Sequence, residues 1–150
     1  MQLVPRRCAL ALAAVIDIAV NARARPVAAK ALAARHRLPP RHLETLLQSL
    51  VHAHVLRGVR GPHGGYELAG EPGAISAGAI VRAALTVAGA HEEGGGARSA
   101  LIDDFVAPLL EDAGAALLTR LDAMTVEGLC RDFGKRRMDP ATDGAEGAQA

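Results

Sequence analysis

The sequence has 150 residues, half of them hydrophobic, and a formal net charge of +1. This length allows one domain with its own core and a helical extension. Aromatic residues make up only 2% of the chain, so Leu, Val, Ile and Ala must form the core. Good helix formers of this kind favour a mainly α fold. No run reaches the ~18 apolar residues of a membrane span, so we expect no membrane-spanning helix.

The charges are distributed unevenly along the chain. Residues 1–70 hold ten Lys and Arg against three Asp and Glu, whereas residues 71–133 hold four against ten. A basic segment beside an acidic one indicates a nucleic-acid surface and a separate partner or regulatory surface. Two solvated surfaces of different charge are the alternative interpretation.

Cys8 and Cys130 are the two cysteines of the chain. Two isolated thiols do not form a disulfide framework, so a reducing cytoplasm is the expected compartment. Arg6-Arg7, the apolar run that follows and Ala22-Arg23-Ala24 together imitate a secretion signal. Asp17 interrupts that run, and an amphipathic helix fits these residues better.

The first predicted helix spans about Arg7–Ala22. Its apolar positions recur at helical spacing and predict a stripe that faces the core: Cys8, Leu12, Val15, Ile16, Ala19 and Val20. Pro26-Val27 opens a short alanine-rich helix that reaches about Arg35. Pro39-Pro40 is typical of the start of the next helix, because proline lacks an N–H that the first turn does not use.

The helix predicted over about Pro40–Ala53 has the clearest pattern. One side is apolar and should be buried: Leu43, Leu46, Leu47, Leu50 and Val51. The opposite side carries Arg41, Thr45, Gln48 and His52, which share one face by their spacing. A hairpin follows, with strands over about Val55–Arg60 and Tyr66–Ala69 and a glycine-rich turn between them.

The second half of the sequence is again helical. Ser76 is a plausible cap for a helix that reaches about Val87, with Ile75 and Ile80 placed to pack together. A flexible loop is expected over residues 89–100. A long helix over about Leu101–Met124 should kink or truly begin at Pro108. Thr125 could cap a last helix that ends near Phe133, and residues 134–150 are expected to be disordered.

This order of elements describes a winged helix-turn-helix, followed by a long C-terminal dimerisation helix. The second helix of such a unit fits the major groove, where only its outward side chains reach the bases. Cations near the hairpin would contact the backbone or the minor groove. The candidate DNA-binding residues are Arg41, His42, Glu44, Thr45, Gln48, Arg57, Arg60, His63 and Gly64, and candidate phosphate contacts are Arg6, Arg7, Arg35 and Arg37.

The segment Arg60-Gly61-Pro62-His63-Gly64-Gly65-Tyr66-Glu67-Leu68-Ala69, with Leu43-Glu44 before it and Ile75-Ser76 after it, resembles the Rrf2 family of transcriptional regulators. That family includes iron–sulfur cluster regulators, nitric-oxide-sensing repressors and cysteine-metabolism repressors. The resemblance covers roughly residues 1–133. It implies a homodimer on a palindromic operator, with the long helix paired across the dimer, bases read near Glu44 and the minor groove contacted by Arg60.

The sequence departs from the cluster-binding members of that family. Those members place three cysteines in the loop after the fourth helix, whereas residues 86–102 contain none. We therefore expect no iron–sulfur cluster, no other cofactor and no metal. His91, Glu92 and Glu93 offer weak metal-ligand chemistry but are better explained as a solvated cluster. Cys8 and Cys130 are expected to be core thiols, with a redox sensor as the alternative.

The sequence thus predicts a cytoplasmic DNA-binding regulator of the repressor type, with double-stranded DNA and a second copy as partners. It divides into a DNA-binding unit (residues 1–88), the loop (89–100), the dimerisation region (101–133) and the tail. Its signal could be a small-molecule effector, a thiol change or a protein partner. The alternative is a winged-helix interaction module with only nonspecific DNA affinity. An enzyme is not expected, because no nucleophile–base pair or phosphate loop is present.

Overall fold

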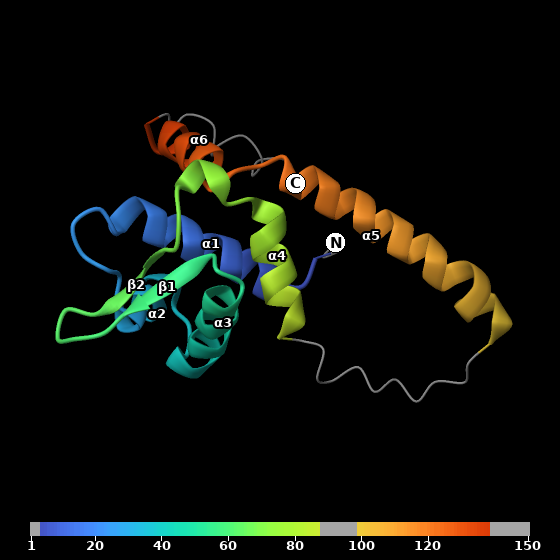
Figure 1. Cartoon of the computed structure of the whole chain (residues 1–150), viewed down its shortest axis with the longest axis horizontal. Coiled ribbons are helices and arrows are strands. Elements are labelled where there is room, and N and C mark those ends of the chain that lie inside the picture. The colour runs from blue at the N-terminus through green and yellow to red at the C-terminus, as the bar shows by residue number, and fades with distance from the viewer. Residues whose placement is uncertain (1–3, 88–98, 139–150) are drawn as a thin grey trace, which may run out of the picture.

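The computed structural model describes residues 4–87 and 99–138. Over these residues the fold is mainly helical with one two-stranded antiparallel sheet, as the sequence predicts. The helices are α1 (Arg6–Asn21), α2 (Ala29–His36), α3 (Pro40–His52), α4 (Ala77–Thr86), α5 (Ala107–Asp122) and α6 (Val126–Met138), and the strands are β1 (Leu56–Val59) and β2 (Gly65–Leu68). Figure 1 shows α1 in the middle of the body, α3 on one side of it and α6 on the other.

Helix α1 is the central element, because it contacts α3, α4, α6 and β2. Its buried residues are Cys8, Ala11, Ala14, Val15 and Ile18. The predicted stripe is therefore only partly correct, since Ile16 and Val20 are half-buried. A helix that is covered from several sides buries more than one stripe, which a single amphipathic pattern does not describe.

Helices α2 and α3 form the helix-turn-helix. Arg37 ends α2 in the left-handed conformation, with φ of 51°, and the Leu38 N–H donates to the Ala33 carbonyl at 3.0 Å. This hydrogen bond closes the helix end and turns the chain into α3. The predicted stripe of α3 is confirmed at Leu43, Leu46, Leu47 and Leu50, which are all buried, whereas Val51 is only half-buried.

The wing consists of β1 and β2 and gains a third backbone partner. The N–H and carbonyl of Val27 bond those of Tyr66 at 2.9 and 2.8 Å. The prediction that Val27 opens the second helix is therefore wrong, and α2 begins at Ala29. Gly65 makes this approach possible, because a Cβ at this position would overlap the carbonyl of Val27.

Helix α4 begins as predicted, with the Ser76 hydroxyl accepting from the Ala79 N–H at 3.1 Å. The chain then returns to this point after α5. The Ala77 N–H donates to the Met124 carbonyl at 2.8 Å, and the Val126 N–H donates to the Ile75 carbonyl at 2.9 Å. The start of α4 and the junction between α5 and α6 are therefore joined through their backbones.

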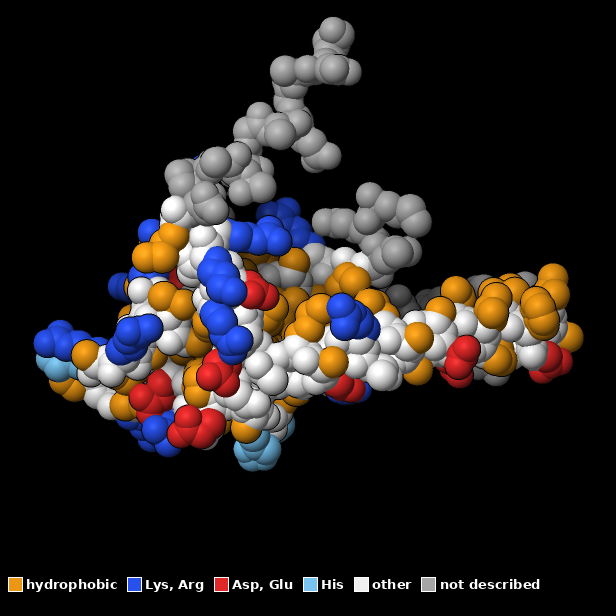
Figure 2. All heavy atoms as spheres, turned by 90° about the horizontal axis from the view of Figure 1, so that it is seen from above, with side chains coloured by type: hydrophobic (Ala, Val, Ile, Leu, Met, Phe, Trp, Pro, Cys, Tyr) orange, Lys and Arg blue, Asp and Glu red, His pale blue; other side chains and the backbone are white. Residues whose placement is uncertain are grey.

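Helix α5 and the π-helical turn Ile102–Val106 before it form an arm that projects from the body (Figure 1). Pro108 lies in the first turn of the regular α-helix, where its missing N–H is tolerated. None of the residues of α5 is buried. Figure 2 shows hydrophobic side chains along the arm, whereas Lys and Arg side chains gather on the body.

Helix α6 corrects the predicted C-terminal boundary. It continues past Phe133 to Met138, so residues 134–138 are helical rather than part of a disordered tail. Its last turn carries Lys135, Arg136 and Arg137, and cations at a helix C-terminus are stabilised by the helix dipole. The rest of the predicted tail, and the predicted loop up to residue 98, lie outside the described residues.

Candidate nucleic-acid interface

The outward face of α3 presents a row of hydrogen-bonding side chains. Arg41, Thr45, Gln48 and His52 are all exposed, and the leucines on the opposite face anchor the helix to the core. The Thr45 hydroxyl donates to the Arg41 carbonyl one turn earlier at 3.4 Å, and the other three side chains form no hydrogen bond with the residues that the structure describes. Glu44 and His42 are also exposed and flank the row on either side. All six of these predicted side chains therefore lie on α3 and are exposed to solvent.

The wing places its predicted residues in different environments. Arg57 lies directly opposite Glu67 in the hairpin, and its Nε donates to the Glu67 carboxylate at 2.6 Å. Its charge is therefore partly neutralised within the wing. Arg60 and His63 are exposed at the tip. Gly64 is half-buried, and a Cβ at this position would overlap the Val59 carbonyl.

A hollow of about 430 Å³ separates the start of α2 from the wing. Lys30 lines it from α2 and Arg60 from the wing, and no carboxylate lines it. The arrangement offers two cations to a phosphate that enters between them. Lys30 was missed in the sequence prediction. Its place in the first turn of α2 is visible in the sequence, but only the docking of Val27 on the wing brings it near Arg60.

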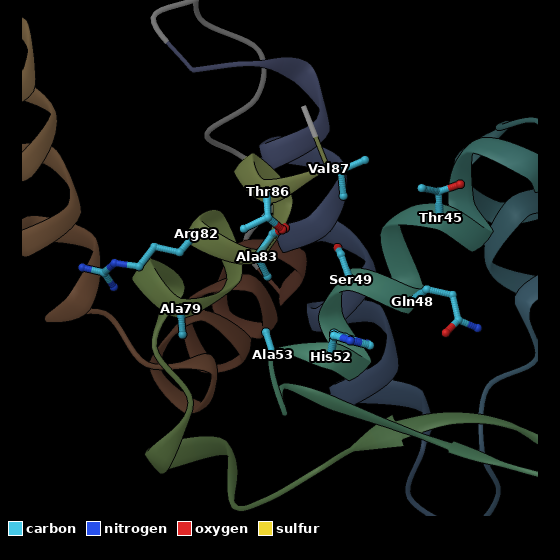
Figure 3. Close-up of a pocket in the computed structure, with 10 residues that line it drawn as sticks. All are labelled: Thr45, Gln48, Ser49, His52, Ala53, Ala79, Arg82, Ala83, Thr86 and Val87. Carbon is cyan, nitrogen blue, oxygen red and sulfur yellow. The ribbon is translucent and has the colours of Figure 1, made fainter. Parts of the chain in front are cut away.

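A second hollow, of about 800 Å³, lies between α3 and α4 (Figure 3). Thr45, Gln48 and His52 line it from α3, and small residues such as Ala79 and Ala83 line it from α4. Its mouth therefore adjoins the outward row of α3.

Two of the four candidate phosphate contacts have another role. The Arg35 guanidinium bonds both carboxylate oxygens of Asp17, at 2.6 and 2.9 Å, and thereby joins α2 to α1. The Nε of Arg7 donates to the Ala84 carbonyl at 3.1 Å and joins α1 to α4. Arg6 and Arg37 are exposed. The structure thus uses Arg7 and Arg35 for packing between helices, which a count of charges does not reveal.

The two thiols lie in poorly reactive surroundings. Cys8 is fully buried in the core, and Cys130 is half-buried. Burial raises the pKa of both thiols; at Cys8 the nearby charge of Arg7 opposes this effect. A raised pKa lowers the fraction of thiolate at neutral pH and therefore favours the core-thiol interpretation.

The donor set does not fit an iron–sulfur cluster of the three-cysteine kind, because the chain has only Cys8 and Cys130. Over residues 4–87 and 99–138, no three His, Cys, Asp or Glu side chains gather as a metal site. His91, Glu92 and Glu93 lie outside the described residues. None of the helices in the described ranges is long and apolar enough to cross a membrane.

Comparison with known proteins gives a family match over most of the chain. The model of the Rrf2 family, described as an iron-dependent transcriptional regulator, matches residues 4–132. A 70-residue stretch is 40% identical to a Synechocystis protein, slr0846, that is named as an HTH-type transcriptional regulator. A 67-residue stretch is 37% identical to the regulator CymR of Bacillus subtilis. These stretches cover 47% and 45% of this chain, and the chain spans only 48% and 49% of these curated relatives.

Solved structures match over a larger part of the chain. The structure of IscR from T. potens is 27% identical with a TM-score of 0.65, and the match covers 98% of this chain and 93% of that one. The structure of CymR from B. subtilis is 28% identical with a TM-score of 0.66, and the match covers 88% and 98% of the two chains. The architecture described above is therefore shared with solved regulators along almost their whole length.

Proposed function

Because this chain belongs to the Rrf2 family of transcriptional regulators, we propose that it binds a palindromic operator as a homodimer and represses transcription there. The observation that carries this proposal is the exposed row on α3, which consists of Arg41, Thr45, Gln48 and His52. Such a row reaches base edges when its helix lies in the major groove. A regulator of this kind acts on the chromosome, so the cytoplasm is the compartment that we propose.

The base contacts follow from the chemistry of each side chain. Arg41 has the two donors that match guanine, Gln48 has the donor and acceptor that match adenine, and Glu44 can accept from cytosine. Lys30 and Arg60 hold a phosphate between α2 and the wing, or Arg60 enters the minor groove. Arg57 contributes less to binding, because Glu67 already pairs with it.

The arm supports a homodimer. Its large apolar side chains are between 42% and 67% exposed, namely Leu101, Ile102, Phe105, Leu109, Leu110 and Leu117. An exposed apolar surface of this extent is typical of an interface, and burial of each large side chain contributes about 1.5–3 kcal/mol. Two arms packed against each other would present two α3 helices to successive half-sites of the operator. We accordingly propose residues 1–88 as the DNA-binding unit and the arm with the start of α6 as the dimerisation region.

The test is selection of bound fragments from a random duplex pool, followed by affinity measurements at several salt concentrations. We expect an inverted repeat to be selected. Gln48→Ala should relax the preference at one position of each half-site and cost about 1–3 kcal/mol. Lys30→Ala should weaken binding to all sequences alike and reduce the salt slope by about one. Lys135→Ala, on the other side of α1, is the control and should change neither property.

Two outcomes would contradict the proposal. A pool with no enriched sequence, together with unchanged affinity of Gln48→Ala, would favour the protein-interaction module instead. A monomer that binds a single half-site would remove the palindrome and the dimer.

We also propose that regulation needs no intrinsic iron–sulfur cluster. The protein purified without oxygen should be colourless, because the thiols that hold such a cluster are absent from residues 86–102. A brown protein with visible absorption would overturn this part of the proposal.

A further inference from the structure

A third hollow lies between the end of α1 and helix α6. Helix α6 lies on the opposite side of α1 from α3 (Figure 1). The hollow has a volume of about 310 Å³, near the lower end of the range for small-molecule pockets. Ala19, Val20 and Arg23 line it from the α1 side, and Cys130, Arg131, Phe133, Gly134 and Arg137 line it from α6. We call it the α1–α6 groove. None of the candidate DNA contacts lines it.

The rim of the α1–α6 groove is strongly basic. Arg23, Arg131 and Arg137 are exposed around it, and no carboxylate lines it. Within the part of the chain that the structure describes, none of these three arginines forms an ion pair, unlike Arg35, Arg57 and Arg82. A guanidinium binds carboxylate or phosphate through two parallel hydrogen bonds. The rim is therefore suited to an anionic group.

The wall of the α1–α6 groove is apolar. Ala19, Val20 and the Cys130 thiol are half-buried there, and the Phe133 ring is 44% exposed. The Arg137 guanidinium lies over the Phe133 ring, 5.9 Å from its centre, and both residues line the groove. A bare inorganic ion would leave these apolar side chains in water. A ligand with an apolar or aromatic body would cover them.

The α1–α6 groove is mechanically connected to the arm. Helix α6 follows α5 after three residues, and its first residue, Val126, is fully buried. The Val126 N–H bonds the Ile75 carbonyl at 2.9 Å beside the start of α4. A ligand that draws α6 toward α1 therefore acts at the point where the arm joins the body. Such a ligand can shift the arm if it binds more tightly to the protein with the arm in one position than in another.

We propose that the α1–α6 groove binds a small organic anion, a carboxylate or phosphate ester with an apolar body, as an effector that changes operator affinity. The effector role rests on the proposed function, whereas binding itself does not. Operator phosphates are not the occupant, because α3 and α6 lie on opposite sides of α1 (Figure 1), so a duplex bound by α3 would face away from the groove.

Cys130 provides a direct test in the full-length protein. Iodoacetamide, a neutral reagent, should alkylate Cys130 slowly at mildly alkaline pH, whereas Cys8 is fully buried and should not react. Phenyl phosphate is the probe. It should slow the alkylation at least about fivefold in a saturable manner, and inorganic phosphate at the same concentration should have a weaker effect. Cys130→Ser measures the background from Cys8.

Variants of the rim complete the test. Arg131→Gln with Arg137→Gln should weaken protection by phenyl phosphate by about tenfold or more, since two charged donors are lost. Arg120→Gln, on the arm, is the matched control and should retain protection. Phenyl phosphate should also shift operator affinity of the wild type but not of the double variant. Without the probe, the double variant should bind the operator as the wild type does.

Each contrary result has a definite meaning. Unchanged alkylation with phenyl phosphate, or equal protection in the double variant, overturns the site. Equal protection by inorganic phosphate overturns the apolar part of the ligand. Protection without a change in operator affinity overturns the effector role. Absence of any selected operator would instead overturn the proposed function, while the alkylation result would still stand.

Discussion

Arg82 on α4 and Asp122 at the end of α5 form a bidentate ion pair, with two N–O distances of 2.6 and 2.7 Å. The hydrogen bonds from Arg82 hold the pKa of the Asp122 carboxyl below its ordinary value. Gly78 lies under this pair, because a Cβ there would occupy the position of the carboxylate. The pair therefore joins the arm to α4, and another face of α4 packs on α1 and α3.

Gly78→Ala should open the Arg82–Asp122 pair and alter the position of the arm. Operator affinity should fall, while the melting temperature should change little, since alanine in a helix gains about 0.5–1 kcal/mol over glycine. The control is Gly134→Ala on α6, away from the arm, where a Cβ meets no atom within 4 Å. It should raise the melting temperature and leave operator affinity unchanged. Equal operator affinity of the two variants would mean that the pair does not position the arm.

Leu109→Glu should separate the two protomers of the proposed homodimer. The side chain is 58% exposed in the protomer, so the fold should persist while the interface gains a charge. Loss of one buried leucine from each protomer should raise the dissociation constant about 100-fold or more. Sedimentation at several concentrations measures this change. Glu111→Ala, on the other face of the same helix, should leave the dimer intact; a dimeric Leu109→Glu would show that α5 is not the interface.

Gly65→Ala should disrupt the wing, because its Cβ would overlap the Val27 backbone. We expect a loss of about 1–3 kcal/mol in the free energy of unfolding, as for overpacking elsewhere, with weaker operator binding. Urea denaturation gives the first quantity. Gly58→Ala in the paired strand, where a Cβ meets nothing within 4 Å, should be tolerated. Similar stability of both variants would contradict the role of Val27 in the wing.

His54→Gly should stabilise the protein. His54 follows α3 in the left-handed conformation, with φ of 58°, and the Val55 N–H closes the helix end on the Leu50 carbonyl at 3.0 Å. A side chain in this conformation costs about 1 kcal/mol, which glycine avoids. The free energy of unfolding should rise by about 0.5–1 kcal/mol. His54→Ala keeps a Cβ and should give no such gain.

Asp17 should make stability depend on pH in the acid range. Burial raises the pKa of its carboxyl, but hydrogen bonds from Arg35, Asn21 and His36 together outweigh burial and lower the pKa overall. A lowered carboxyl pKa stabilises the fold above the unfolded-state pKa, and this stability is lost as the pH falls through the folded-state pKa.

Asp17→Asn should therefore cost about 1–3 kcal/mol at neutral pH and lose less stability than the wild type when the pH falls below about 4. Urea denaturation between neutral pH and about pH 3 measures both effects. Asp132→Asn on the exposed side of α6 is the control. If the free energy of unfolding depended on pH in the same way in the wild type and in Asp17→Asn, the hydrogen bonds of Asp17 would not stabilise the contact between α1 and α2.

Much of the structure could be predicted from local patterns in the sequence alone. The leucine spacing of α3 set both its length and its outward row, because burial of one face leaves the other to solvent. The Ser76 cap was also correct, and Gly61 in the wing has the positive φ expected of a turn glycine, since each depends on a few neighbouring residues. Gly65, which was predicted in the turn, is instead the first residue of β2. The same patterns carried the family resemblance, which the match over residues 4–132 confirms.

Only the tertiary structure decided which groups meet across long separations. Val27 pairs with the wing instead of starting a helix, Arg35 forms an ion pair with Asp17, and Lys30 lies near Arg60. Arg131 and Arg137 line a groove only because α6 returns to pack on α1. A local pattern records periodicity and propensity, whereas the partner of a charge or of a free N–H depends on how distant elements pack.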